Sequence, residues 1–292
     1  MTIAATVHDS KSRRLRELFD GDRVIRAVGA HDALAARLIE AAGFEAIWAS
    51  SLELSASHAV PDAGLLTMTQ YLDAAEDMDA ATSLPVIADC DTGFGGPLNV
   101  EHLVVRYERR GIAAVCIEDK MFPKMNSFAA VAHPLVTVEE FAEKISSGKA
   151  VQRDPDFMLF ARTEALIADL PMSEALERGY AYAEAGADAV LVHSRMDRAD
   201  QVLEFAAQWQ SEVPLIAIPT TYHGVHEQEL RDAGYRLVIY ANQVIRAQVG
   251  AVTSMLNRLA TEGRAGSVEA QIVPIRELFQ LQGMKAAFRT KQ

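Results

Sequence analysis

The segment VIADCDTG, residues 86–93, ends a short apolar run in two aspartates, and three later segments repeat this arrangement. They are AAVCIEDK (113–120), FMLFARTE (157–164) and AVLVHSR (189–195). Each run has the length and composition of a buried strand, and a helical pattern follows each one. This alternation predicts parallel βα units. Eight such units close a barrel whose active site lies at the carboxyl ends of the strands.

The remaining apolar runs bring the predicted number of strands to eight. The predicted strands are Arg23–Val28, Ala46–Ala49, Pro85–Asp89, Ala114–Glu118, Phe157–Arg162, Ala189–His193, Leu215–Ile218 and Leu237–Tyr240. The segments between them have the apolar spacing of amphipathic helices, and several end in glycine, as at Gly43 and Gly111. No linker interrupts the pattern, so residues 1–292 are predicted to form one α/β domain, a modified (β/α)8 TIM-like barrel.

Composition excludes several classes of partner. The chain of 292 residues is 50% hydrophobic and has a net charge of -12, which argues against nucleic acid and anionic membranes as partners. No apolar run approaches the length of a membrane span, and the first residues lack a signal-peptide core. Cys90 and Cys116 lie in predicted strands as buried, reduced thiols. We therefore expect a cytoplasmic protein.

The C-terminal region, from about residue 242 to 292, predicts two further helices. The second of them, in VPIRELFQLQG, has an apolar face that includes Ile275, Leu278, Phe279 and Leu281. Such a face must be buried, either on the barrel itself or against a neighbouring subunit. The pattern favours a homo-oligomer.

The acidic residues at two neighbouring strand ends predict a metal site. Asp89 and Asp91 alternate with Cys90, so in a strand both carboxylates point the same way. Like charges this close require a cation, and carboxylate oxygens suit Mg²⁺. Glu118, at the end of the next strand, is expected to face the same cavity. The alternatives are that Asp91 only caps the following turn and that Glu118 only forms an ion pair.

Substrate-binding candidates come from other loops and strand ends. The long, non-periodic segment 121–134 predicts a lid, in which Lys124 and Asn126 would neutralise or bind an anionic group. Arg162 suits carboxylate or phosphoryl oxygens, and His193 suits an oxyanion or a proton transfer. A solvated lysine and a structural histidine are the alternatives.

The end of the second predicted strand offers a further anion site. Trp48 is predicted to wall the cavity or simply to be buried, and the amides of Ser50, Ser51 and Leu52 can hold an anion. Asp62, in a nearby loop, is ambiguous from pattern alone.

Taken together, these motifs resemble the phosphoenolpyruvate mutase/isocitrate lyase superfamily, and its phosphonate branch in particular. The resemblance covers nearly the whole chain and is carried by segments that include GAHDALAARLIEAAGFEAIW, ADCDTGFG, IEDKMFPKMNS, ARTEALIA, EAGADAVLVHSR, IPTTY and RELFQLQG. Dinucleotide, P-loop, HExxH, CxxC and GxSxG motifs are absent from the sequence.

The resemblance implies a barrel whose C-terminal helix is exchanged between subunits, giving a dimer of dimers. It implies Mg²⁺, with Mn²⁺ or Co²⁺ as substitutes, held mainly by Asp89, while Asp91, Glu118 and Asp62 act through waters. It further implies that Lys124 and Asn126 lie on a gating loop, that Arg162 and His193 contact the anionic substrate, and that the Ser50–Leu52 amides form an anion pocket beside Trp48.

Three reactions are compatible with this resemblance. Asn126 favours a mutase that interconverts phosphoenolpyruvate and phosphonopyruvate, since the related hydrolase carries Thr there. The segment ELSASHAVPDAGLLTM instead looks like that hydrolase, which releases pyruvate and phosphate. A carbon–carbon lyase is disfavoured because the lid lacks the family's catalytic Cys. A non-catalytic sensor of organic acids is a further alternative, and Ala49 and Ser51, which replace family glycines, suggest a reshaped pocket.

Overall fold

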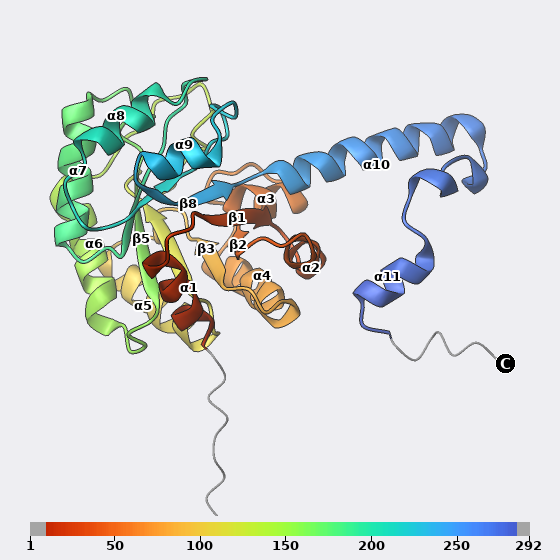
Figure 1. The fold of residues 1–292 in the computed structure, drawn as a ribbon, viewed down its shortest axis with the longest axis horizontal. Coiled ribbons are helices and arrows are strands. Elements are labelled where there is room, and N and C mark those ends of the chain that lie inside the picture. The colour runs from red at the N-terminus through yellow and green to blue at the C-terminus, as the bar shows by residue number, and fades with distance from the viewer. Residues whose placement is uncertain (1–9, 285–292) are drawn as a thin grey trace, which may run out of the picture. The chain divides into compact units, whose positions relative to one another are not determined.

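The computed structural model describes residues 10–284 and divides the chain into two units after Asn242. The first unit is a closed barrel of eight parallel strands in sequence order, with β8 pairing back to β1, and helices surround it (Figure 1). The strands are β1 (Ile25–Ala30), β2 (Ala46–Ala49), β3 (Val86–Asp89), β4 (Ala114–Glu118), β5 (Met158–Thr163), β6 (Ala189–Val192), β7 (Leu215–Ala217) and β8 (Tyr235–Tyr240). The predicted TIM-like barrel is confirmed.

Helices follow the strands as the apolar spacing predicts. In the first unit they are α1 (Lys11–Asp20), α2 (Ala33–Ala41), α3 (Ser51–Ser57), α4 (Met68–Ala81), α5 (Pro97–Arg109), α6 (Val138–Val151), α7 (Met172–Glu184), α8 (Asp200–Gln208) and α9 (Glu227–Asp232). The glycine cap predicted after α5 is present: Gly111 has φ 79°, in the left-handed region that a side chain disfavours.

Several predicted strand boundaries are wrong by one or two residues. β1 begins at Ile25 rather than Arg23 and continues to Ala30, because Ala30 is still in register with Ala49 of β2. β8 begins at Tyr235, two residues before the predicted start at Leu237, because Tyr235 pairs with Leu215 of β7. The remaining differences are single residues at the start of β3 and β5 and at the end of β5, β6 and β7. Pairing with the neighbouring strands sets these ends.

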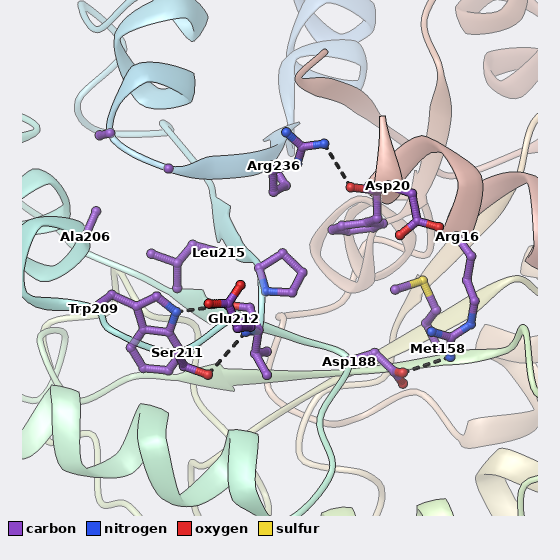
Figure 2. A pocket seen from close by; sticks show the side chains of 15 residues that line it. Arg16, Asp20, Met158, Asp188, Ala206, Trp209, Ser211, Glu212, Leu215 and Arg236 are labelled. Atoms are coloured by element: carbon purple, nitrogen blue, oxygen red, sulfur yellow. Dashed lines mark hydrogen bonds and ion pairs between the residues drawn. The ribbon is translucent and has the colours of Figure 1, made fainter. Parts of the chain in front are cut away.

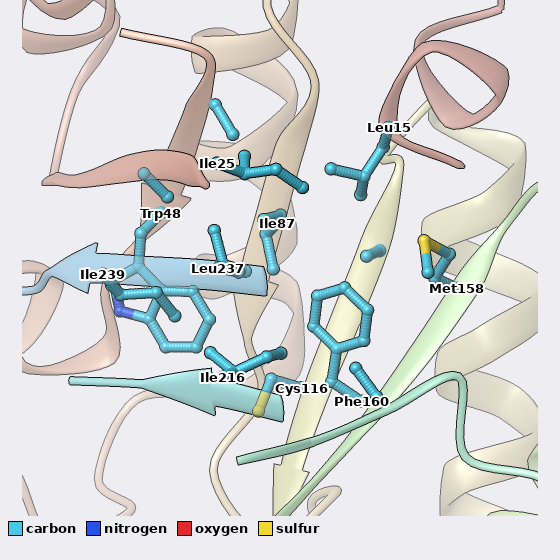
Figure 3. Packing of buried hydrophobic residues seen from close by; sticks show 14 of the residues in the cluster. Leu15, Ile25, Trp48, Ile87, Cys116, Met158, Phe160, Ile216, Leu237 and Ile239 are labelled. Carbon is cyan, nitrogen blue, oxygen red and sulfur yellow. The ribbon is translucent and has the colours of Figure 1, made fainter. Parts of the chain in front are cut away.

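The inside of the barrel is filled by alternate residues of its strands. Cys116 and Phe160, two residues before Glu118 and Arg162, belong to one buried cluster with Trp48 and Ile239 (Figure 3). Helix α1 contributes Phe19 to this cluster, with its ring centroid 5.6 Å from that of Phe160. Because strand side chains alternate, the next inward positions, at the carboxyl ends of the strands, are those of the polar residues.

The second unit is helical. It comprises α10 (Gln243–Glu262), the short 3-10 helices η1 (Ala265–Ser267) and η2 (Glu269–Gln271), and α11 (Ile275–Leu281). No residue of α10 is buried, and Val249, Leu256 and Ile275 are exposed. Among residues 10–284, no helix is long and apolar enough to span a membrane.

Candidate active site

A narrow cavity lies at the carboxyl ends of the barrel strands. Ten residues predicted from the sequence line it: Trp48, Ser50, Ser51, Leu52, Asp62, Asp89, Lys124, Asn126, Arg162 and His193. Its volume is about 40 Å³. One water needs roughly 10–15 Å³ of such space, so the lid segment 121–134 leaves room for only a few waters.

The predicted acidic cluster is buried beside this cavity. Asp89, Asp91 and Glu118 are 8%, 3% and 2% exposed, although only Asp89 lines the cavity itself. The predicted continuation of the strand to Asp91 is wrong. β3 ends at Asp89, and Asp91 has φ 50° in a turn closed by the Gly93 amide and the Cys90 carbonyl. Cys90 and Cys116 are buried free thiols, as predicted.

The turn after β3 does not use Asp91 as a helix cap. Helix α5 begins after Gly96, whose amide donates to Asn99 Oδ1 at 3.1 Å. Asp91 instead faces Lys124 Nζ at 2.8 Å and accepts a hydrogen bond from Tyr71 at 3.4 Å. The Asp91 side chain therefore belongs to the polar cluster.

The acidic cluster has the character of a cation site. Burial raises the pKa of Asp89 and raises that of Asp91 to about 7, with Lys124 opposing both shifts. Glu118 Oε1 is buried and accepts no hydrogen bond. Within residues 10–284, no three His, Cys, Asp or Glu side chains stand close enough to enclose a metal by themselves. Buried carboxylates that accept few hydrogen bonds fit Mg²⁺, which keeps several waters and takes few protein ligands.

Lys124 connects the lid to the acidic cluster. Its Nζ lies 3.0 Å from Asp62 and donates to Ser51 Oγ at 3.1 Å. Burial alone would lower the pKa of Lys124, but the carboxylates, Asp91 and Glu118 foremost, hold it well above its usual range. Burial likewise opposes ionisation of Asp62, but Lys124 and Asn126 outweigh it and lower the pKa of Asp62. The alternative of a solvated lysine is therefore wrong.

Arg162 and His193 meet through Glu164. Arg162 Nε donates to Glu164 Oε1 at 2.6 Å, and His193 Nδ1 lies 2.9 Å from the same oxygen. Burial and the Arg162 guanidinium lower the pKa of His193, and the Glu164 carboxylate opposes this shift. Burial opposes the charge on Glu164, yet Arg162, His193 and Lys120 hold its pKa well below the usual range. This network fixes the Arg162 guanidinium in the cavity wall.

The turn after β2 differs in detail from the predicted anion pocket. The Ser50 amide donates to the Ala30 carbonyl at 3.2 Å, so it is engaged within the barrel. The Ser51 amide lies 3.4 Å from Asp89 Oδ2, and Ser51 Oγ donates to the same oxygen at 2.7 Å. Trp48 lines the cavity floor and is 1% exposed. Two of the three proposed amides are thus directed at protein oxygens.

The cavity also contains residues that the sequence did not single out. They are Ser127, Phe128, Ile218, Thr220, Ala241 and Asn242. Ser127 Oγ donates to Glu164 Oε2 at 2.5 Å and accepts from Lys120 Nζ at 2.6 Å. Ser127 and Phe128 could have been identified as cavity residues from their position in the predicted lid. Ile218 could have been identified because it ends a predicted strand. For Asn242, only closure of the barrel brings β8 beside β1.

A second, larger cavity of about 510 Å³ lies among residues of α1, α8 and the segments leading into β6 and β7. Its charged groups are largely engaged with the protein, as Figure 2 shows: Arg16 pairs with Asp188 at 2.8 Å, and Arg236 donates to the Phe19 carbonyl at 2.8 Å. This is the amino end of the strands, where barrel residues serve stability rather than catalysis.

Comparison with known proteins shows which family this chain belongs to. The sequence pattern of the family described as phosphoenolpyruvate phosphomutase matches residues 15–260. Phosphonopyruvate hydrolase of Variovorax sp. (strain Pal2) is 44% identical over 94% of this chain and 95% of its own length.

Solved structures give the same result. The crystal structure of phosphoenolpyruvate phosphomutase from Streptomyces platensis subsp. rosaceus matches with a TM-score of 0.93 and 49% identity, covering 94% of this chain and 95% of that chain. A phosphonopyruvate hydrolase in complex with oxalate and Mg²⁺ matches with a TM-score of 0.89 and 43% identity, at the same coverage. The resemblance seen in the sequence is confirmed, and the chain belongs to the phosphoenolpyruvate phosphomutase family.

Proposed function

We propose that the protein is a Mg²⁺-dependent phosphoenolpyruvate mutase that interconverts phosphoenolpyruvate and phosphonopyruvate. The observation that carries this proposal is the narrow cavity of about 40 Å³, where Lys124, Asn126 and Arg162 face one small space beneath the lid. A phosphoryl group that leaves one atom of pyruvate enolate and returns to another must be held and kept from water. The cavity supplies both positive charge and enclosure.

Each residue of the cavity would have its own role in the reaction. Arg162, held by Glu164, would bind phosphoryl or carboxylate oxygens, and His193 would hydrogen-bond to them. Asn126 would orient the migrating group from the lid, since its side chain is held by Asp62 at 2.7 Å. Asp62 and Lys124 would keep the lid closed during transfer.

Asp89 would be the main protein ligand of the metal, with Asp91, Glu118 and Asp62 acting through waters. When bound, Mg²⁺ supplies positive charge that stabilises a developing enolate oxygen. Mn²⁺ and Co²⁺ would be substitutes. The substrate would be a small anion, bound also by the Leu52 amide at the turn after β2.

Phosphonopyruvate hydrolysis is the second candidate. It is favoured by the relative from Variovorax, which is 44% identical over 94% of this chain and bears the name of that activity. The two reactions share substrate and metal and differ in what captures the phosphoryl group. The enolate oxygen gives phosphoenolpyruvate, whereas water gives phosphate.

The test is ³¹P NMR of the purified full chain with Mg²⁺ and phosphonopyruvate. We expect a phosphoenolpyruvate signal to appear. Inorganic phosphate with pyruvate as the sole products would show a hydrolase instead. An unchanged spectrum would overturn both candidates and direct attention to the pocket at Ser51.

Replacing Asn126 with Ala is expected to lower kcat by roughly a hundredfold, because a single preorganised hydrogen-bond donor contributes about 10²–10³ in rate. Asn126 lies on the lid, so the melting temperature should stay within the error of the wild-type value. Steady-state kinetics and thermal unfolding would measure the two effects. Wild-type turnover in this variant would remove Asn126 from the mechanism.

We also propose that the C-terminal region joins subunits into a homo-oligomer, a dimer of dimers. Helix α10 has no buried residue, and apolar side chains such as Val249 and Leu256 are 59% and 53% exposed. Apolar surface of this kind favours association. A cytoplasmic location would suit the two free, buried thiols.

A further inference from the structure

Among the apolar side chains that line the active-site cavity, Phe128 differs in its exposure. Trp48 and Ile218 also line the cavity, but they are 1% and 3% exposed, whereas Phe128 is 44% exposed. Phe128 is the one apolar lining residue in residues 10–284 that ranks among the exposed large hydrophobic side chains. Its ring therefore stands between the cavity and the solvent.

The Phe128 ring is held over the reactive end of the cavity. Its centroid is 5.6 Å from that of His193, and the two rings meet edge to face at 76°. The Phe128 amide donates to Asn126 Oδ1 at 3.0 Å, and the preceding Ser127 is bonded to Glu164 and Arg162. The lid thus positions the ring beside His193 and Asn126, two of the residues assigned to the phosphoryl group.

The neighbouring polar groups of the lid are already engaged. Asn126 bonds to Asp62, and Ser127 bonds to Lys120, Glu164 and Arg162. The Phe128 ring beside His193 offers an entering water no hydrogen bond. An apolar group at the solvent side of a polar cavity has this excluding effect.

We propose that Phe128 is the specificity-determining residue that keeps water from the migrating phosphoryl group. It would thereby favour the mutase reaction over hydrolysis. This inference rests on the proposed mutase function. From phosphonopyruvate, the P–C bond breaks and its electron pair stays on pyruvate as the enolate. The enolate oxygen then forms the new P–O bond. If water enters, its oxygen takes the phosphoryl group, one of its protons is released from that oxygen, and C3 of the enolate is protonated to give pyruvate.

The experiment is the product ratio of Phe128→Ala, measured by ³¹P NMR with Mg²⁺ and phosphonopyruvate. We expect the ratio of phosphate to phosphoenolpyruvate to rise about tenfold, which corresponds to ~1.4 kcal/mol between the two barriers. Phe128→Leu, which keeps an apolar side chain, should stay close to the wild-type ratio. A product ratio reports on water entry, and a general loss of packing would slow both products alike.

Met125→Ala is the matched control. Met125 is 42% exposed on the same lid segment but does not line the cavity. It should leave the product ratio unchanged. An unchanged ratio in Phe128→Ala, with slower turnover to both products, would overturn the role of Phe128 and leave the mutase function standing. If the wild-type protein made only phosphate, the mutase function and this inference would both be wrong.

Discussion

Asp89→Ala is expected to remove Mg²⁺-dependent turnover. A bound divalent ion contributes several kcal/mol of transition-state stabilisation, so the loss should be at least about a thousandfold in kcat/KM. Asp89 is 8% exposed at the end of β3, and its Oδ2 accepts a hydrogen bond from Ser51 Oγ at 2.7 Å. Of the other predicted metal ligands, Asp62 alone lines the cavity, and it forms an ion pair with Lys124 at 3.0 Å.

Metal binding should be measured separately from activity. Isothermal titration with Mg²⁺ or Mn²⁺ should show binding to the wild-type protein and none to Asp89→Ala at the same concentrations. The melting temperature of the metal-free variant should not fall, because burial already raises the pKa of Asp89 and makes its charge costly. Asp232→Ala, at an exposed position of α9, is the control and should keep both binding and turnover. Undiminished metal affinity in Asp89→Ala would show that another residue is the main ligand.

Asp119→Ala is expected to destabilise the fold by about 3–5 kcal/mol, the cost of breaking a buried ion pair on one side. Asp119 is fully buried, and its Oδ2 accepts from Tyr182 at 2.8 Å and from Arg178 at 3.3 Å. Its Oδ1 accepts from the Glu164 amide at 2.8 Å. Burial raises the pKa of Asp119 to about 6, so its charge is costly, but its removal leaves the Arg178 guanidinium without this partner.

Urea unfolding would measure this loss, and the melting temperature should fall on the order of 10 °C. The double variant Asp119→Leu, Arg178→Met should recover much of the stability, because both charges are then absent. Equal losses in the single and double variants would show that packing, rather than the ion pair, is responsible. Turnover should fall as well, because Asp119 fixes the backbone of Glu164, which holds Arg162 and His193.

Much of the site could be predicted because the strands alternate. Glu118 and Arg162 stand two positions beyond Cys116 and Phe160, and the barrel interior contains that earlier pair. Period-two alternation then directs the later pair into the same space above it. Asp91 was predicted to join the acidic cluster as part of a strand. It does lie in that cluster, but a turn with positive φ, and not a continued strand, brings it to Lys124.

Strand ends and hydrogen-bond partners could not be predicted in the same way. Ala30 extends β1 because it pairs with Ala49, and Tyr235 begins β8 because it pairs with Leu215, and both pairings depend on the neighbouring strand. The amide of Ser50 was assigned to an anion, but the Ala30 carbonyl of the adjacent strand accepts its hydrogen bond. These hydrogen-bond partners lie on neighbouring strands, so the local sequence of one strand does not predict them.

The sequence alone determined the barrel, its order of strands and the carboxyl-end position of Asp89, Glu118, Arg162 and His193, because periodicity is a local property of the chain. The tertiary structure decided which groups meet. It brought Lys124 of the lid to Asp62 and Asp91, joined Arg162 to His193 through Glu164, and placed Phe128 over the cavity. Apart from the pair Arg162–Glu164, these contacts join residues far apart in the chain, and only closure of the barrel and its lid brings them within bonding distance.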